Sequence, residues 1–317
     1  MPGRLYFMGR RGTNTMKVFI TGGTGFVGSA LTKKLTDQGH NVTLLTRKIR
    51  GDRPVLNGVS MLEGDPVKEG AWQEKVSEHD VLINLAGASI FRRWTKEEKK
   101  LIRESRIRTT ENLVNALKER KGKKTTFLST SAVGYYGFHG DEELDESTPP
   151  GNDFLASVAK EWEETALKAE KLGARVLLCR FGIVLGKSGG ALGEMLPIFR
   201  KGLGARLGSG EQWFSWIHQR DLIRIIIFLM DREDLSGPFN CTAPEPVTNR
   251  DLTTILAEVL GKPTFLPAVP GFVIKLMKGE FGSVLLQGQK VFPRKLLEAG
   301  FQFDLPGLKR ALVDLVG

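Results

Sequence analysis

The chain of 317 residues is long enough for one large domain or two ordinary ones, and its 41% hydrophobic and 26% charged residues are typical of a soluble globular protein. No apolar run approaches the roughly 18 residues that span a bilayer, so we expect no membrane segment. The formal net charge of +10 comes from Lys and Arg that are scattered and mixed with Glu, which argues against a nucleic-acid-binding stripe. Cys179 and Cys241 have apolar neighbours and no metal-ligand spacing, which indicates reduced thiols in a cytoplasmic protein with no metal site.

The N-terminal residues differ in character from the rest of the chain. Residues 1–15 carry three Arg and no acidic residue, and they lack the apolar segment of a signal peptide. Met16 directly precedes Lys17 and is a candidate for the true start. We therefore expect residues 1–15 to be a disordered or non-native extension.

A glycine-rich turn follows the first expected strand. An apolar run ending at Ile20 precedes Thr-Gly-Gly-Thr-Gly-Phe-Val-Gly (residues 21–28), and an amphipathic segment follows. Gly22 permits a tight turn, Gly25 lets a phosphate approach the backbone, and Gly28 lets the helix pack close to the strand. A strand, turn and helix in this order predict a dinucleotide pyrophosphate site, whereas the alternative is a structural turn without a ligand. The expected contacts are Gly22, Thr24, Gly25, Phe26, Val27 and Gly28.

The end of the second expected strand, over residues 42–46, bears on the choice of cofactor. NAD sites carry a carboxylate about 20 residues past the glycines, where it binds the ribose 2′-hydroxyl. Here the sequence reads Thr46-Arg47-Lys48. An Arg pairs with a 2′-phosphate, so this end of the strand favours NADP over NAD. The alternative is that Arg47 and Lys48 are solvated loop charges.

Two further strands extend the pattern. A short strand leads into Asp65, which either accepts a hydrogen bond from the adenine amino group or caps a helix starting near Pro66. The next strand, residues 81–85, ends in Leu85-Ala86-Gly87, where small residues leave room for a cofactor ribose. Successive strand–helix units with apolar strands predict an α/β fold, a Rossmann-type, doubly wound parallel sheet covered on both faces.

Later motifs resemble the extended short-chain dehydrogenase/reductases, the NAD(P)-dependent epimerase/dehydratase group. The resemblance rests on residues 21–28, on Gly64-Asp65, on Asn-Leu-Ala-Gly (84–87) and on Ser-Thr-Ser-Ala-Val-Gly-Tyr-Tyr-Gly (129–137). Residues 180–186, 216–222, 240–244 and 286–293 are similar to an atypical branch labelled nucleoside-diphosphate-sugar epimerase. The resemblance covers residues 16–317 and implies cofactor contacts from Ser129, Gly182 and Ile183. It implies a Rossmann domain over 16–185 and a substrate-binding lobe mainly over 186–317, with some segments returning to the sheet.

The family's catalytic pair is missing. Its members use a Ser or Thr after the fifth strand and a Tyr-x-x-x-Lys pair on the next helix, in which the Lys lowers the Tyr pKa. Ser131 matches the Ser, but taking Lys160 as the Lys places Ala156 at the Tyr position. Tyr135 is our candidate substitute.

Three other residues stay open as candidates. Tyr136 and His218 are further candidates to replace the missing Tyr. The alternative for Tyr136 is core packing, and the alternative for His218 is a structural hydrogen bond. Arg106 stands where many members carry an active-site Asn, so it either binds an anionic substrate or is a surface charge.

We therefore expect an NADP(H)-binding oxidoreductase or epimerase-like enzyme. Its partner is a small-molecule substrate, a carbonyl or hydroxyl compound or a sugar nucleotide, which Ser131 and Tyr135 would orient at the nicotinamide. We expect a monomer or a homodimer with neither nucleic acid nor membrane as a partner. The alternative is a non-catalytic NADP(H)-binding regulator that senses the redox state.

Overall fold

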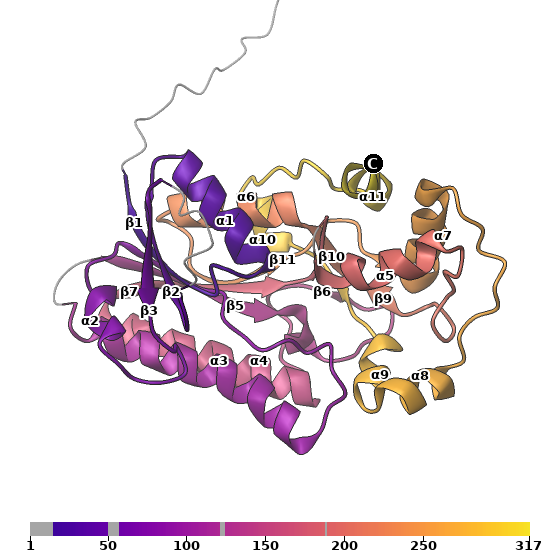
Figure 1. Cartoon of the computed structure of the whole chain (residues 1–317), viewed down its shortest axis with the longest axis horizontal. Coiled ribbons are helices and arrows are strands. Elements are labelled where there is room, and N and C mark those ends of the chain that lie inside the picture. The colour runs from indigo at the N-terminus through magenta and orange to yellow at the C-terminus, as the bar shows by residue number, and fades with distance from the viewer. Residues whose placement is uncertain (1–14, 50–56, 121–123, 188) are drawn as a thin grey trace, which may run out of the picture.

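The fold is built around a seven-stranded parallel sheet (Figure 1). The computed structural model describes residues 15–49, 57–120, 124–187 and 189–317. The strand order is β3-β2-β1-β4-β5-β7-β11, and every neighbouring pair runs parallel. This order confirms the predicted doubly wound Rossmann-type α/β fold. The prediction for residues 1–15 lies outside the described residues, apart from Thr15.

The elements follow in chain order, and the sheet takes its last strand from far along the chain. The sheet strands are β1 Lys17–Thr21, β2 Asn41–Thr46, β3 Val59–Glu63, β4 Val81–Asn84, β5 Thr125–Ala132, β7 Ala174–Phe181 and β11 Gly237–Cys241. The short strands are β6 Glu143–Leu144, β8 Ile183–Gly186, β9 Trp213–Phe214, β10 Trp216–His218, β12 Val247–Thr248 and β13 Lys290–Val291. The α-helices are α1 Phe26–Asp37, α2 Trp72–Val76, α3 Lys96–Leu117, α4 Phe154–Leu167, α5 Gly190–Arg200, α6 Gln219–Asp231, α7 Asn249–Leu260, α8 Gly271–Lys278, α9 Phe281–Leu285, α10 Arg294–Glu298 and α11 Leu308–Val316. Two 3-10 turns are η1 Val133–Tyr136 and η2 Lys168–Leu172.

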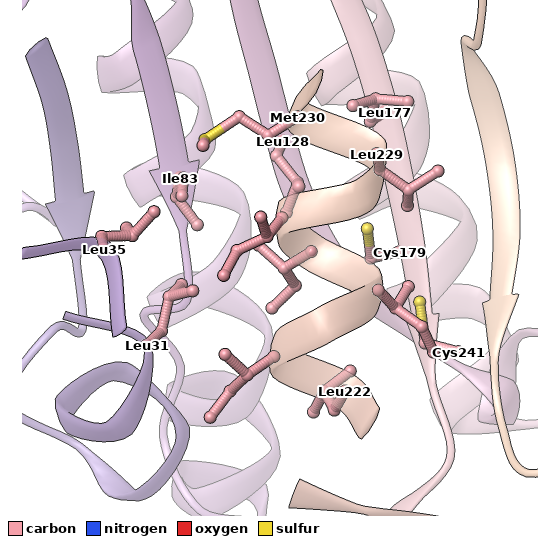
Figure 2. Close-up of a cluster of buried hydrophobic side chains, with 14 of the residues drawn as sticks. Leu31, Leu35, Ile83, Leu128, Leu177, Cys179, Leu222, Leu229, Met230 and Cys241 are labelled. Atoms are coloured by element: carbon pink, nitrogen blue, oxygen red, sulfur yellow. The ribbon is translucent and has the colours of Figure 1, made fainter. Parts of the chain in front are cut away.

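Helices α1 and α6 cover one face of the sheet. Leu31 and Leu35 of α1 and Leu229 of α6 are fully buried against the strands (Figure 2). Cys179 of β7 and Cys241 of β11 lie in the same core as buried free thiols. Each large aliphatic side chain buried here contributes about 1.5–3 kcal/mol, so this layer is a major source of stability.

Helices α2, α3 and α4 cover the other face. Their core includes Trp72, Leu113 and Ala166, which pack on Phe19 and Phe127 of the sheet. Figure 1 shows α3 and α4 running side by side beneath the sheet. Both faces are therefore buried, which explains why the strands are apolar throughout rather than alternating.

The C-terminal half supplies a second lobe and part of the sheet. Helices α5, α7 and α11 share a separate apolar core, with Leu192, Leu256 and Leu312 at its centre. Figure 1 shows this lobe beyond one end of the sheet, with α8 and α9 below it. Strand β11 and helix α6 belong instead to the Rossmann layers. None of the helices in the described ranges is long and apolar enough to cross a membrane.

Candidate functional site

The turn between β1 and α1 is held tight by glycines. Gly22 has φ +72°, and a Cβ there would lie 2.7 Å from the Leu85 carbonyl at the end of β4. A Cβ on Gly28 would lie 2.3 Å from Gly22 O, so the helix touches the turn backbone to backbone. Gly25 N donates to Gly22 O at 3.0 Å and closes the turn. Larger residues at Gly22 and Gly28 would push the helix away from the sheet.

Helix α1 begins without a side-chain cap from any residue that the structure describes. Its N-cap is Gly25, which offers no side chain, and its first turn contains no acidic residue. By contrast, Thr95 caps α3 and Thr248 caps α7, each with acidic residues in the first turn. The orphan N–H groups and the helix dipole favour an anion at the start of α1.

A cleft of about 870 Å³ runs from this turn across the carboxyl ends of β2 and β4. Its volume lies within the range of roughly 300–1,000 Å³ that small-molecule sites occupy. The cleft brings together these predicted cofactor residues: Gly22, Thr24, Gly25, Thr46, Arg47, Lys48, Asp65, Leu85, Ala86 and Gly87. Phe26, Val27, Gly28, Ser129, Gly182 and Ile183 are not among its lining residues.

Helix α3 contributes a wall of the cleft that our sequence reasoning missed. Glu98, Leu101, Ser105 and Thr109 all line it, three or four residues apart on one helical face. That helical spacing was the available signal, but it does not say whether the stripe faces solvent or a ligand. The other lining residues that were missed are Gly23, Ser29, Thr32, Leu44, Leu45, Ile49, Val59, Met61, Pro66, Val67, Ala88, Ser89 and Arg92.

At the expected adenine end, the cleft carries cations and one acid. Arg47 and Lys48 follow β2, and the Glu63 carboxylate is turned to Ile49 N at 3.4 Å rather than lining the cleft. Asp65 does line the cleft, and its Oδ1 accepts a hydrogen bond from Val67 N at 3.2 Å. Asp65 therefore caps a turn, and the expected helix near Pro66 begins only at Trp72.

Ser131 lies in a buried polar network. Its side chain is only 1% exposed, and its Oγ donates to Glu163 Oε1 at 2.6 Å. Arg180 Nε and Nη2 donate to the two oxygens of the same carboxylate, each at 2.8 Å. The Ser131 hydroxyl is therefore committed to Glu163 rather than directed into the cleft.

The two adjacent tyrosines belong to the same network. The Tyr136 hydroxyl accepts from Arg180 Nη1 at 2.9 Å and donates to Asn240 Oδ1 at 2.7 Å. The Tyr135 ring lies on the Arg180 guanidinium, with its centroid 3.6 Å from Cζ. Burial raises the pKa of Tyr135 and also the pKa of Tyr136 above the ordinary phenol value. Both hydroxyls are thus protonated at neutral pH, and neither is a phenolate base.

Helix α4 lacks the proton-transfer pair in space as well as in sequence. Ala156 is fully buried, and its N–H donates to the N-cap Asp153 at 3.0 Å. The Lys160 side chain is 55% exposed and lies 3.8 Å from Glu164. Lys160 therefore points to solvent, one turn away from a position with no hydroxyl.

Phe26, Gly182 and Ile183 make packing and backbone contacts instead of lining the cleft. The Phe26 ring fits against Gly186 and Gly189, where a Cβ would come within 2.5 Å and 2.8 Å of it. Gly182 N donates to Cys241 O at 3.1 Å, and Ile183 N donates to Ser215 O at 2.8 Å. In these contacts the three residues act as scaffold.

His218 is the N-cap of α6. Its Nδ1 accepts a hydrogen bond from Arg220 N at 3.0 Å, and its side chain is buried. This contact matches the structural alternative considered for His218 rather than the role of a substitute for the missing Tyr.

A larger hollow of about 1110 Å³ lies between α1, α6 and the C-terminal segment. Two of its arginines pair with acids of the same hollow: Arg220 with Asp314 at 2.7 Å, and Arg224 with Asp304 at 2.9 Å. Of the candidate site residues only His218 lines it, and none of the predicted cofactor residues does. The cleft at the glycine turn is therefore the better candidate site.

Comparison with known proteins agrees with this geometry. Residues 18–241 match the family model described as the NAD dependent epimerase/dehydratase family, and residues 269–315 match a domain of unknown function, DUF1731. The Arabidopsis thaliana "Epimerase family protein SDR39U1 homolog, chloroplastic" is 40% identical over 98% of this chain and 91% of its own length.

Two solved structures are similar over nearly the whole chain. The human epimerase family protein SDR39U1 with NADPH is 34% identical, with a TM-score of 0.82 over 95% of this chain and 99% of that one. The nucleoside-diphosphate sugar epimerase from Corynebacterium glutamicum is 33% identical, with a TM-score of 0.75 over 96% of this chain and 59% of that longer one.

Proposed function

The chain belongs to the NAD-dependent epimerase/dehydratase family, and we propose that it binds NADP(H) in the cleft at the glycine turn. The observation that carries this proposal is the junction of Gly22, Gly25 and the uncapped start of α1. These groups fit a pyrophosphate, because they combine close backbone approach with unused N–H donors.

Arg47 and Lys48 select the phosphorylated cofactor in this proposal. Both line the cleft after β2, where an NAD site would place a carboxylate. The guanidinium of Arg47 would pair with the 2′-phosphate. The relative that was crystallised with NADPH, the human protein, supports this choice.

Titration of NADPH and NADH against the protein tests the cofactor proposal. We expect NADPH to bind more tightly than NADH. Arg47→Ala should weaken the binding of NADPH by roughly 10- to 100-fold, as for loss of a charged hydrogen bond. The NADH affinity of this variant should change less than about threefold. Arg108→Ala should change neither affinity by more than that, because Arg108 is exposed and does not line the cleft. NADH binding as tight as NADPH would contradict the role of Arg47.

The proposed activity is oxidoreductase or epimerase-like chemistry on a carbonyl, hydroxyl or sugar-nucleotide substrate. Ser131 and Tyr135 stay our predicted substrate-orienting residues. The contacts of Ser131 add a condition, because a substrate oxygen would have to replace Glu163 as its acceptor. Tyr135 would act as a hydrogen-bond donor, since burial raises its pKa.

A non-catalytic regulator that senses the NADP(H) redox state is the second candidate. The buried Ala156 at the Tyr position favours it, since the protein lacks the family's usual acid–base pair. Incubation with NADPH and a panel of carbonyls and sugar nucleotides separates the two. Oxidation of NADPH by any compound supports the enzyme, whereas no turnover together with a partner that binds only one redox state supports the regulator.

Oligomeric state and location stay predictions. We propose a monomer or homodimer in the cytoplasm, which gel filtration and fractionation of cells would check.

A further inference from the structure

Arg106 differs from the other enclosed arginines in its partners. Arg180 is paired with Glu163, and Arg120 lies 3.6 Å from Asp80. Arg175 donates to four backbone carbonyls and to Thr126. Among the described residues, no carboxylate lies within ion-pair distance of Arg106.

The guanidinium of Arg106 is held in one orientation. One flat side lies against Gly87, where a Cβ would be 3.2 Å from Cζ, and the Trp162 ring centroid lies 5.3 Å from Cζ. Nη1 donates to Ala88 O at 3.1 Å and to Ile102 O at 2.9 Å. Nε and Nη2 have no hydrogen-bond acceptor in the part of the chain that the structure describes, and the side chain is partly accessible.

Arg106 is not itself among the residues that line the cleft, but its guanidinium contacts two residues that are. Gly87 and Ala88, which contact the guanidinium, line the cleft just after β4. In a Rossmann sheet the adenosine half of the cofactor lies over the strands on the β2 and β3 side of β1, and the nicotinamide half lies over β4 and β5. Because Nε and Nη2 have no acceptor among the described residues and the side chain is partly accessible, an anion that enters there would meet two free donors of a cation.

We propose that Arg106 is the anchor for a substrate carboxylate beside the nicotinamide. The free Nε and Nη2 donors form a planar edge that matches the two oxygens of a carboxylate. The inference rests on the proposed function, since it places the substrate next to bound NADP(H). It assigns the substrate to the class of small carboxylic acids or carboxylate-bearing sugars.

Matched pairs of ligands test this assignment on the full chain. Oxalate, malonate, succinate, their diamides and inorganic phosphate are titrated into the NADPH complex of the wild type, Arg106→Gln, Arg106→Lys and Arg108→Gln. Arg108 is the control, because it lies two residues along α3 with its guanidinium exposed and paired with Glu104. Circular dichroism verifies that each variant is folded, and Arg106→Lys keeps the charge if the Gln variant does not fold.

We expect at least one dicarboxylate to bind the wild type at least 10-fold more tightly than its diamide. Arg106→Gln should lose roughly 10- to 100-fold of that affinity, as for a charged hydrogen bond. Arg106→Lys should keep part of the dicarboxylate affinity, and Arg108→Gln should keep all of it. The NADPH affinity of every variant should stay within about threefold of the wild-type value.

Several results would overturn the assignment. These are a wild type that binds NADPH but no dicarboxylate, a preference for phosphate alone, equal affinities in Arg106→Gln and Arg108→Gln, or loss of NADPH binding in Arg106→Gln. The last result would make Arg106 a cofactor residue. Failure of the wild type to bind NADPH at all would instead contradict the proposed function.

Discussion

Glu163 of α4 and Arg180 of β7 form a doubly hydrogen-bonded ion pair beneath the end of the sheet. Both side chains are almost fully buried, and Ser131 donates to the same carboxylate. Burial alone lowers the pKa of Arg180, but the hydrogen bonds and charge of Glu163 outweigh it and raise that pKa. The pair and the Ser131 hydrogen bond tie together β5, β7 and α4.

Breaking this pair should destabilise the protein strongly. Arg180→Leu leaves the Glu163 carboxylate buried without its cation, a change that costs about 3–5 kcal/mol in free energy of unfolding. Lys160→Leu on the same helix removes an exposed pair and should cost less than about 1 kcal/mol. Urea unfolding measures both variants, and equal losses would argue against a structural role for the buried pair.

Alanine substitutions at two glycines of the turn should have different effects, one on stability and the other on cofactor binding. The Cβ of Gly28→Ala would meet backbone atoms at 2.3 Å and 2.6 Å, so this variant should lose at least about 1–3 kcal/mol of stability. Gly25 has φ −80°, which Ala tolerates, and its Cβ would lie 3.2 Å from Gly22 O. Gly25→Ala should therefore stay folded and bind NADPH at least 10-fold more weakly. Thermal melts and NADPH titration check both changes, and unaltered NADPH affinity in folded Gly25→Ala would contradict the phosphate site.

Mild acid should destabilise the protein through protonation of His218. Burial lowers the pKa of this histidine below its usual value of 6.5, and the neighbouring Asp314 only partly opposes the shift. A histidine with a depressed pKa binds fewer protons in the folded state than in the unfolded state. Its contribution to the free energy of unfolding is therefore fully present above pH 6.5 and is lost as the pH drops towards the folded-state pKa. His218→Asn keeps an N-cap oxygen for Arg220 N without the titration. Between pH 7 and pH 5 the melting temperature of this variant should fall less than that of the wild type. An equal fall would contradict the prediction.

Removal of the Arg106 charge should not destabilise the ligand-free protein. Burial lowers the pKa of Arg106 to about 10 from 12.5, a shift worth up to about 3 kcal/mol of destabilisation at neutral pH, less where water reaches the group. Arg106→Met keeps an unbranched side chain and loses the cation–π contact with Trp162 and the bonds to two carbonyls. We expect its melting temperature without ligand to equal or exceed that of the wild type. A variant that melts several degrees lower would show that the charge is structural.

The sequence by itself determined the Rossmann sheet and part of the lining of the cleft at the glycine turn. The glycine turn, the apolar strands and the cationic end of β2 are each encoded in short segments, because turn geometry and strand burial depend on neighbouring residues. Gly22, Gly25, Arg47 and Gly87 were therefore predicted together and line one cleft.

Only the tertiary structure decided the partners of the polar side chains. Ser131 meets Glu163 32 residues later, and Tyr136 meets Asn240 104 residues later. The stripe of α3 that faces the cleft also depends on how distant elements pack, and so does the absence of a carboxylate beside Arg106 in the described part of the chain. Hydrogen bonds and ion pairs act within a few ångströms, and no local pattern specifies which distant atoms come that close.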